Sequence, residues 1–137
     1  MKANRIIVSD RDARRLRVLI DQALHLGPRE REYALRLQGE IDRAEIVPED
    51  KLPEDVIALY SRVELEDLSD GEVSVYTLVF PEEADVTEGK ISILAPIGTG
   101  MLGFRVGDEF QWDTPGGEMR LKVRKVTAHA EEGMNLR

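Results

Sequence analysis

Apolar positions in the first third of the chain recur every three or four residues, in two separate runs. The first run consists of Ala13, Leu16, Ile20, Ala23 and Leu24. The second run consists of Ala34, Leu37, Ile41 and Ala44, with Tyr33 beside it. This spacing places each run on one face of an amphipathic helix. The pattern therefore predicts two helices of about 15 residues, each roughly 22 Å long.

The residues around these runs indicate where the helices begin and end. Ser9 precedes Asp12 by three residues, which resembles a capping box with Asp in place of Glu or Gln. Gly27 can end the first helix in a left-handed conformation, and Pro28 can open the second. So short a connection predicts an antiparallel, coiled-coil-like helical hairpin. We assign this hairpin to residues 1–46.

After the hairpin the period changes from that of a helix to that of a strand. Residues 47–60 contain two prolines and several acids, and we interpret them as a linker or lead-in. Val63 and Leu65 then alternate with charges, as in a half-buried strand. Residues 72–80 are apolar on both faces, which predicts a strand that is covered on both sides.

The rest of the chain predicts further strands around one short helix. A strand over residues 90–94 leads into a helix over residues 96–102, which begins with proline. Two strands flank Thr-Pro-Gly-Gly at residues 114–117, which suits a type II turn with a positive φ at its third residue. We therefore expect an α+β protein, with a mostly antiparallel sheet around a short helix over residues 61–130 and a tail at residues 131–137.

Composition narrows the class of protein. The 137 residues are 42% apolar and 34% charged, as expected of a soluble globular chain, and they include no cysteine. Disulfides, thiol catalysis and cysteine-bound metals are thereby excluded. No apolar run approaches the roughly 18 residues of a membrane span, and the N-terminus lacks a signal-peptide core. We expect a cytoplasmic protein that makes no contact with a membrane.

The net charge of −8 is unevenly distributed along the chain. Residues 1–44 hold 10 Lys and Arg against 7 Asp and Glu, whereas residues 45–137 hold 9 against 20. The acidic body argues against general binding to nucleic-acid backbones, and we expect no direct, sequence-specific binding of nucleic acid. The mildly basic first third is either a solvated helical face or a surface that steers a partner.

Motifs for catalysis or cofactor binding are weak. Residues 98–103 match Gly-x-Gly-x-x-Gly after a strand, but the helix must end by Gly103, too early for a dinucleotide site. The small residues more simply allow this helix to lie close to the sheet. His25 and His129 form no metal-ligand pair, and no serine lies in a Gly-x-Ser-x-Gly turn. The sequence predicts no catalytic residue, no cofactor and no metal site.

Two segments are candidates for contact with a protein partner. The first consists of Leu94, Ala95, Pro96 and Ile97. These residues form either a structural strand-to-helix corner or an exposed apolar corner that docks on a protein. The second segment is the tip of the predicted hairpin, with His25, Arg29 and Glu30.

Three motifs follow one another in the second half of the chain: a strand that enters a proline-led helix, a Val-Gly-Asp turn at residues 106–108, and a Thr-Pro-Gly-Gly-Glu hairpin. In this order, residues 61–127 resemble the C-terminal domain of the Gre transcription elongation factors. The matching positions are Ile91, Ser92, Pro96, Ile97, Leu102, Gly103 and residues 114–118. The resemblance implies an FKBP-like fold that docks on the rim of the secondary channel of bacterial RNA polymerase.

In that family the docking contact matches Leu94, Ala95 and Pro96 of this chain. Leu94 and Ala95 replace polar residues of the family pattern, and Gly98-Thr99 replaces an Ala-Arg pair. A polar docking contact has therefore become apolar here, or has moved.

The predicted hairpin departs further from the family. Gre factors carry a long coiled coil whose acidic tip helps to hold a catalytic metal in the polymerase and promotes cleavage of backtracked RNA. Here the hairpin is short, and Glu30 and Glu32 alternate with Arg29 and Arg31, which neutralise the carboxylates that a divalent cation needs. The short hairpin resembles the Rnk-like branch of the family, as do residues 52–56, 61–63 and 68–73.

The resemblance implies a monomeric transcription regulator that binds RNA polymerase at the entrance of the secondary channel. It would compete with Gre factors without stimulating transcript cleavage. Two alternatives remain open. One is a regulator that contacts a metabolic enzyme such as nucleoside diphosphate kinase, for which the Rnk-like proteins are named. The other is an FKBP-like prolyl isomerase, for which the fold alone is weak support.

Overall fold

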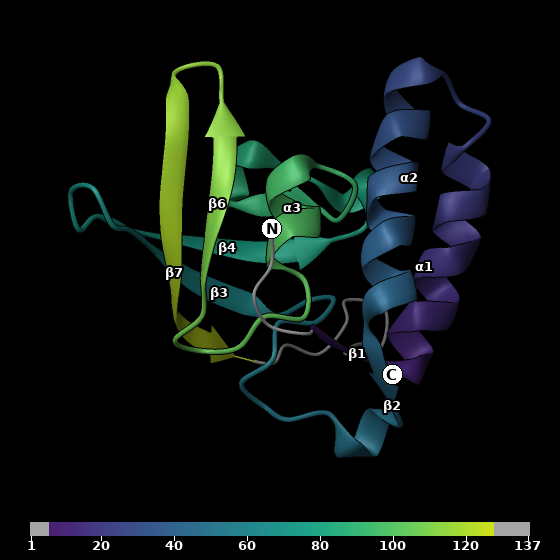
Figure 1. The fold of residues 1–137 in the computed structure, drawn as a ribbon, viewed down its shortest axis with the longest axis horizontal. Coiled ribbons are helices and arrows are strands. Elements are labelled where there is room, and N and C mark those ends of the chain that lie inside the picture. The colour runs from purple at the N-terminus through teal and green to yellow at the C-terminus, as the bar shows by residue number, and fades with distance from the viewer. Residues whose placement is uncertain (1–5, 128–137) are drawn as a thin grey trace.

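The computed structural model describes residues 6–127 and shows a helical hairpin beside a curled sheet that holds a short helix (Figure 1). The hairpin consists of α1 (Asp10–Ala23) and α2 (Pro28–Arg43). The sheet consists of β3 (Arg62–Asp67), β4 (Val73–Val79), β5 (Lys90–Ser92), β6 (Glu109–Thr114) and β7 (Gly117–Thr127), with α3 (Pro96–Met101) packed against it. Short 3-10 helices lie at Glu49–Lys51, Pro81–Glu83 and Val86–Glu88. The predicted α+β class is confirmed, while the predicted tail and His129 lie outside the described residues.

The two long helices pack along the apolar faces that the sequence predicts. Their buried residues are Ala13, Leu16, Ile20, Ala23, Ala34, Leu37 and Ile41. Ser9 caps α1, because its Oγ accepts a hydrogen bond from the Asp12 N–H at 3.0 Å. The expectation that Gly27 ends α1 is wrong: the chain leaves α1 at Leu24 in a right-handed conformation, and Gly27 precedes α2 with a φ of 152°. Pro28 opens α2 as predicted.

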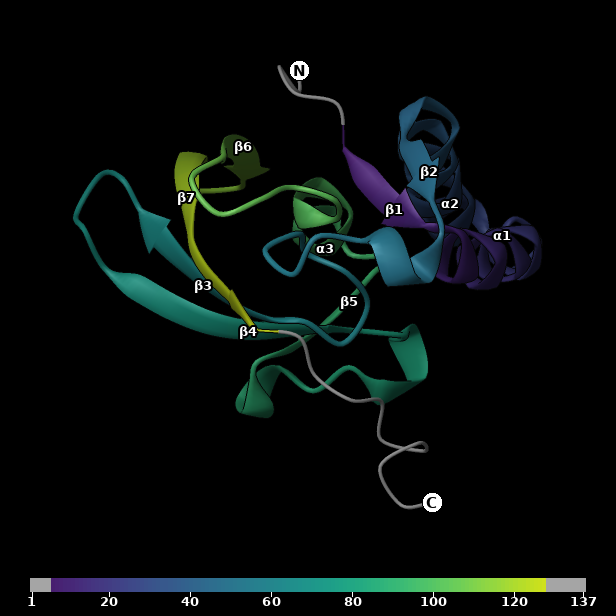
Figure 2. The ribbon, with the colours of Figure 1, turned by 90° about the horizontal axis from the view of Figure 1, so that it is seen from below.

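A two-stranded parallel sheet at the base of the hairpin is absent from the predictions. β1 (Ile7–Ser9) leads into α1 and β2 (Glu45–Val47) follows α2, so the pair joins the two ends of the hairpin (Figure 2). Strands of three residues are too short to show an alternating pattern. The Ile7 N–H also donates to the Gly103 carbonyl at 3.3 Å, which connects this small sheet to the loop between α3 and β6.

The larger sheet has the strand order β5-β4-β3-β7-β6, in which only β4 and β5 are parallel neighbours. It curls around α3, which lies on its concave side (Figure 2). The fully buried side chains around α3 include Leu65, Leu78, Ile93, Met101, Phe104 and Val123. Gly98 permits the close approach of α3, because a Cβ at this position would lie 2.2 Å from the Ser92 carbonyl oxygen. The prediction that small residues bring this helix close to the sheet is confirmed.

Two details of the sheet differ from the predictions. Val73 and Val75 in the first half of β4 are 51% and 39% exposed, whereas Leu78 and Val79 at its end are buried. The predicted cover on both faces therefore exists for only part of the strand. In the turn between β6 and β7, the positive φ of 125° lies at Gly117 and not at Gly116, so the turn is not the predicted type II.

The second half of the predicted linker, residues 47–60, contributes to the core. Its buried residues are Val56, Ile57, Leu59 and Tyr60. The Ile57 N–H donates to the Phe104 carbonyl at 2.8 Å, and the Ile57 carbonyl accepts from the Gly103 N–H at 2.9 Å. This stretch is therefore packed into the sheet unit before β3 begins. Among residues 6–127, no helix combines the length and the apolar content needed to cross a bilayer.

Candidate protein-docking site

The corner between β5 and α3 is held by hydrogen bonds to Ser92. Its hydroxyl oxygen accepts from the Leu94 N–H at 3.0 Å, and its carbonyl accepts from the Ala95 N–H at 3.0 Å. Ala95 is extended and Pro96 opens α3, at a position where the missing proline N–H is not needed. The backbone therefore has one defined path from strand to helix.

Burial divides the four predicted corner residues into two pairs. Leu94 and Ile97 are 8% and 6% exposed and belong to the core, whereas Ala95 and Pro96 are half-buried at the surface. Of the two alternatives for this segment, the structural strand-to-helix corner describes Leu94 and Ile97, because these larger side chains belong to the core. A partner can reach Ala95 and Pro96, whose role in docking stays a prediction.

The two residues that follow the corner, Gly98 and Thr99, pack against the backbone of β5 and the corner itself. Thr99 is 2% exposed, and its hydroxyl donates to the Ile93 carbonyl at 2.7 Å. Gly98 lies against the Ser92 carbonyl. These two residues stand where the family pattern has an Ala-Arg pair, and in this chain both serve internal packing.

Pro96 also borders a cleft that the sequence did not indicate. The cleft has a volume of about 940 Å³ and lies between α2 and β6, which stand on either side of α3 in Figure 1. Its lining consists of Arg36, Glu40 and Arg43 from α2, Pro96, Thr99 and Gly100 from α3, and Glu109, Phe110, Gln111, Trp112, Asp113 and Arg120 from the hairpin of β6 and β7. These segments are far apart in the chain, so no local pattern could have predicted the cleft.

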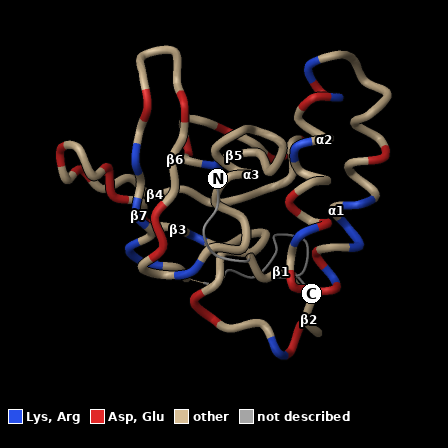
Figure 3. The backbone as a smooth tube through the Cα atoms, in the orientation of Figure 1, with Lys and Arg blue, Asp and Glu red and all other residues tan. Residues whose placement is uncertain are grey.

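Charged residues of both signs are distributed along the two helices and along the strands (Figure 3). The ion pairs near the cleft are Arg43–Glu40 at 3.1 Å, Arg36–Glu32 at 3.7 Å and Arg120–Glu109 at 3.5 Å. On α2 the side chains of Arg36 and Arg43 are 50% and 69% exposed, whereas that of Glu40 is 15% exposed. The α2 side of the cleft therefore presents guanidinium groups to solvent more than it presents carboxylates.

The tip of the hairpin carries the other candidate residues. His25 and Arg29 are exposed, and a hydrogen bond from the Arg29 guanidinium to the Tyr33 hydroxyl raises the pKa of Arg29 above its ordinary value. Glu30 is half-buried, with its Oε1 3.1 Å from the position that a Cβ at Gly27 would take. This carboxylate lies over the N-terminus of α2, where a negative charge is stabilised. Within residues 6–127, no group of three or more His, Asp or Glu is placed to hold a metal ion.

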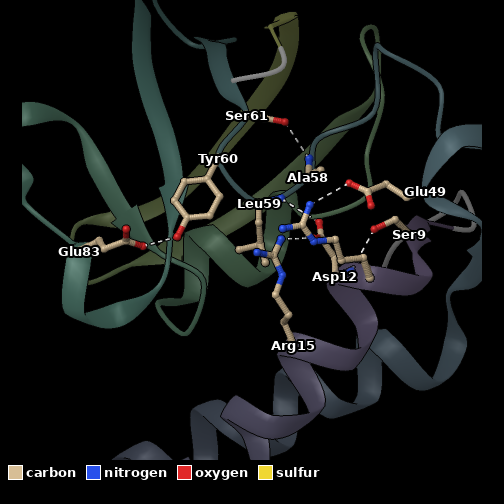
Figure 4. A network of polar contacts seen from close by, with 10 residues as sticks. Ser9, Asp12, Arg15, Glu49, Ala58, Leu59, Tyr60, Ser61 and Glu83 are labelled. Carbon is tan, nitrogen blue, oxygen red and sulfur yellow. Dashed lines mark hydrogen bonds and ion pairs between the residues drawn. The ribbon is translucent and has the colours of Figure 1, made fainter. Parts of the chain in front are cut away.

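A network of polar contacts joins the hairpin to the sheet unit (Figure 4). The buried Asp12 carboxylate accepts a hydrogen bond from the Arg15 guanidinium at 2.6 Å and another from the Leu59 N–H at 3.2 Å. The Arg15 guanidinium also lies 5.7 Å from the centre of the Phe80 ring. The sequence predicts Asp12 as part of a capping box, whereas its carboxylate connects the first turn of α1 to the segment before β3.

Two further contacts surround this network. Arg11 pairs with Glu49 at 3.3 Å, and the Tyr60 hydroxyl donates to the Glu83 carboxylate at 2.5 Å. Tyr60 has a φ of 69°, a left-handed conformation that is uncommon for a residue other than glycine. The hairpin is thus held through α1, by the ion pair of Arg11 with Glu49 and by the hydrogen bond of Asp12 with Leu59.

Comparison with known protein families assigns both parts of this architecture. Residues 52–128 match the family model "Transcription elongation factor, GreA/GreB, C-term", and residues 4–47 match "Rnk N-terminus". The chain therefore belongs to the GreA/GreB family of transcription elongation factors, as the resemblance of its motifs implied.

Individual relatives agree with this assignment. The chain is 41% identical over 112 residues to the "Regulator of nucleoside diphosphate kinase" of Escherichia coli strain K12, which covers 82% of this chain and 80% of that protein. It is 48% identical over 90 residues to the transcription elongation factor GreA of Geobacillus kaustophilus, covering 66% of this chain and 57% of that one. Among solved structures, a GreA/GreB transcription elongation factor from Nitrosomonas europaea is 36% identical, with a TM-score of 0.73 over 90% of this chain and 98% of that one. The predicted fold of a helical hairpin followed by a Gre-type domain is confirmed.

Proposed function

We propose that this chain is a transcription regulator that binds RNA polymerase at the entrance of the secondary channel and does not stimulate transcript cleavage. Membership of the GreA/GreB family supports the choice of partner. The observation that carries the second part is the length of the hairpin, whose helices have 14 and 16 residues. At a rise of about 1.5 Å per residue, the longer helix reaches roughly 24 Å.

The chemistry of the tip supports the same conclusion. Promoting cleavage by a Gre-type mechanism requires carboxylates that are free to share a metal ion at the polymerase active centre. Glu30 lies over the N-terminus of α2, and Arg29 and Arg31 flank it in the chain. Carboxylates beside guanidinium groups attract a divalent cation weakly. The tip therefore fits occupation of the channel entrance better than delivery of a metal.

Binding to the same rim would make this protein a competitor of the longer Gre factors. The test uses core RNA polymerase with a labelled Gre factor bound to it. We expect unlabelled protein to displace the label, and no binding at tens of micromolar would overturn the proposal. A cleavage assay on backtracked complexes tests the second part, in which robust cleavage above the intrinsic rate would refute the argument from hairpin length.

The printed name of the Escherichia coli relative also fits a different function, direct contact with nucleoside diphosphate kinase. An effect on expression of that enzyme would lead to the same name, and the family assignment favours transcription. Affinity capture against purified kinase and purified polymerase separates the two. The FKBP-like prolyl isomerase alternative rests on fold alone, and an isomerisation assay on a proline peptide tests it.

A further inference from the structure

In the hairpin, α1 lies on the side away from the sheet (Figure 1), and a stripe of solvent-accessible side chains runs along it. At about 3.6 residues per turn, the positions in this stripe fall within a sector of about 100° around the helix axis. Leu24 keeps helical backbone angles and the His25 N–H donates to the Gln22 carbonyl at 3.2 Å, so the stripe continues into the turn. Its members are Asp10, Arg14, Arg17, Val18, Asp21 and His25. The stripe is distinct from the buried face of α1 that packs against α2.

The charges of this stripe complement a second copy of the same stripe that runs in the opposite direction. Asp10 and His25 lie equally far from a midpoint between residues 17 and 18, and so do Arg14 and Asp21. An antiparallel copy centred on this midpoint therefore has Arg14 opposite Asp21, and by two-fold symmetry this pair occurs twice. It also has Asp10 opposite His25, whose imidazole N–H can donate to the carboxylate. A parallel copy in register would bring like charges together, which is unfavourable, so the pattern favours an antiparallel partner.

An exposed apolar residue and a hollow lie at the centre of the stripe. Val18 is next to the midpoint and is 60% exposed. Beside it, a hollow of about 360 Å³ between α1 and α2 is lined by Arg17, Val18, Ile20, Asp21, Leu24 and Gln38. In the antiparallel arrangement Arg14 of the second copy lies over this hollow, where its methylene groups can cover Leu24 while its guanidinium reaches Asp21. The exposed pair of Arg14 with Asp10 within one chain, at 3.9 Å, contributes little and can be exchanged for this contact.

We propose that α1 pairs in the antiparallel direction with α1 of a second copy of this chain, about a two-fold axis beside Val18. The two hairpins then form a four-helix unit with the two α1 helices at its centre. The contact is a single pair of helices, each about 21 Å long, which is at the small end of specific interfaces. The dimer is therefore weak, and the monomer that the family resemblance implies prevails in dilute solution. The contact involves neither polymerase nor the β5–α3 corner, so this inference stands or falls independently of the proposed function.

The first test exchanges the charges of one pair in the full chain. Sedimentation equilibrium at up to about 1 mM protein measures the dissociation constant of the dimer, with thermal melting as the check on folding. Arg14→Asp brings a carboxylate opposite Asp21 and should weaken the dimer at least about tenfold. Arg31→Asp makes the same change in net charge on an exposed arginine of α2 and should stay within about twofold of the wild type. Arg14→Asp combined with Asp21→Arg restores opposite charges and should return the dissociation constant to within about threefold of the wild type.

The second test uses the absence of cysteine from the chain. Val18→Cys introduces a thiol beside the two-fold axis, and Val86→Cys, at a position that is 91% exposed in the sheet unit, is the matched control. A bismaleimide with a spacer of about 8 Å, close to the distance between packed helix axes, should link the Val18→Cys chains into dimers and leave the control monomeric. A wild type that sediments as a monomer at about 1 mM, or equal crosslinking of the two cysteine variants, would overturn this inference while the proposed function stands. A wild-type dimer that the charge exchange fails to restore would assign the contact to another surface and also overturn it.

Discussion

Replacing Asp12 by alanine removes the carboxylate that joins the hairpin to the sheet unit. The substitution leaves the Leu59 N–H without its acceptor and the Arg15 guanidinium without its 2.6 Å partner. An unpaired buried N–H costs about 1–3 kcal/mol, and breaking a buried ion pair costs about 3–5 kcal/mol. The Arg15 side chain is 26% exposed and can regain water, so the lower end of these ranges applies. The two costs come from the loss of one carboxylate and are not additive, so we expect a loss of about 3 kcal/mol in the free energy of unfolding.

Asp10→Ala is the matched control, because Asp10 also lies in the first turn of α1, where a carboxylate interacts favourably with the helix dipole. Its carboxylate is 45% exposed and lies 3.9 Å from Arg14, so its loss should cost about 0.5 kcal/mol or less. Urea unfolding at pH 7 measures the free energy of unfolding of both variants. In thermal melts the Asp12→Ala variant should have a melting temperature about 10 °C below that of the wild type. Equal stabilities of the two variants would refute the assignment of Asp12 to the junction.

Three further changes test separate features. Gly98→Ala places a Cβ 2.2 Å from the Ser92 carbonyl oxygen, so it should lower the free energy of unfolding in urea by about 3 kcal/mol or more. An unchanged free energy of unfolding would contradict the close packing of α3. The hydrogen bond from Arg105 lowers the pKa of the Asp55 carboxyl below its ordinary value of 3.8. The ionised pair stabilises the fold above that pH, and this stabilisation is lost as the pH falls through the lowered pKa. Arg105→Ala should therefore raise the pKa of Asp55 in a carboxyl NMR titration and weaken the acid-side loss of stability, and an unchanged titration would exclude this pairing. Ala95→Arg adds a long charged side chain at the accessible half of the corner and should weaken polymerase binding about tenfold or more with no loss of stability, whereas unaltered affinity would remove this corner from the docking site.

The sequence was sufficient for the elements whose pattern is local. The apolar faces of α1 and α2 follow from their period, and Pro28 and Pro96 mark two helix starts because proline suits the first turn. Gly98 could be interpreted correctly because a run of small residues after a strand has a direct packing consequence.

Features that depend on contacts between distant segments were missed. The pairing of β1 with β2 involves three residues on each side, too few for a period, and the cleft is enclosed by segments that meet only in the folded chain. The burial of Leu94 and Ile97 depends on how α3 packs, which the order of apolar residues does not reveal. Asp12 was assigned to a local cap because its partner Leu59 is 47 residues away in sequence.

The parallel pairing of β1 and β2 means that the hairpin leaves and rejoins the rest of the protein at a single point. An equal number of turns could be inserted into both arms without altering that anchor, and each added turn would extend the arm by about 5.4 Å. The length of the hairpin can then vary independently of the rest of this architecture. A graded series of elongated hairpins on one unchanged sheet unit would measure how far the tip must extend before the polymerase active centre responds to it.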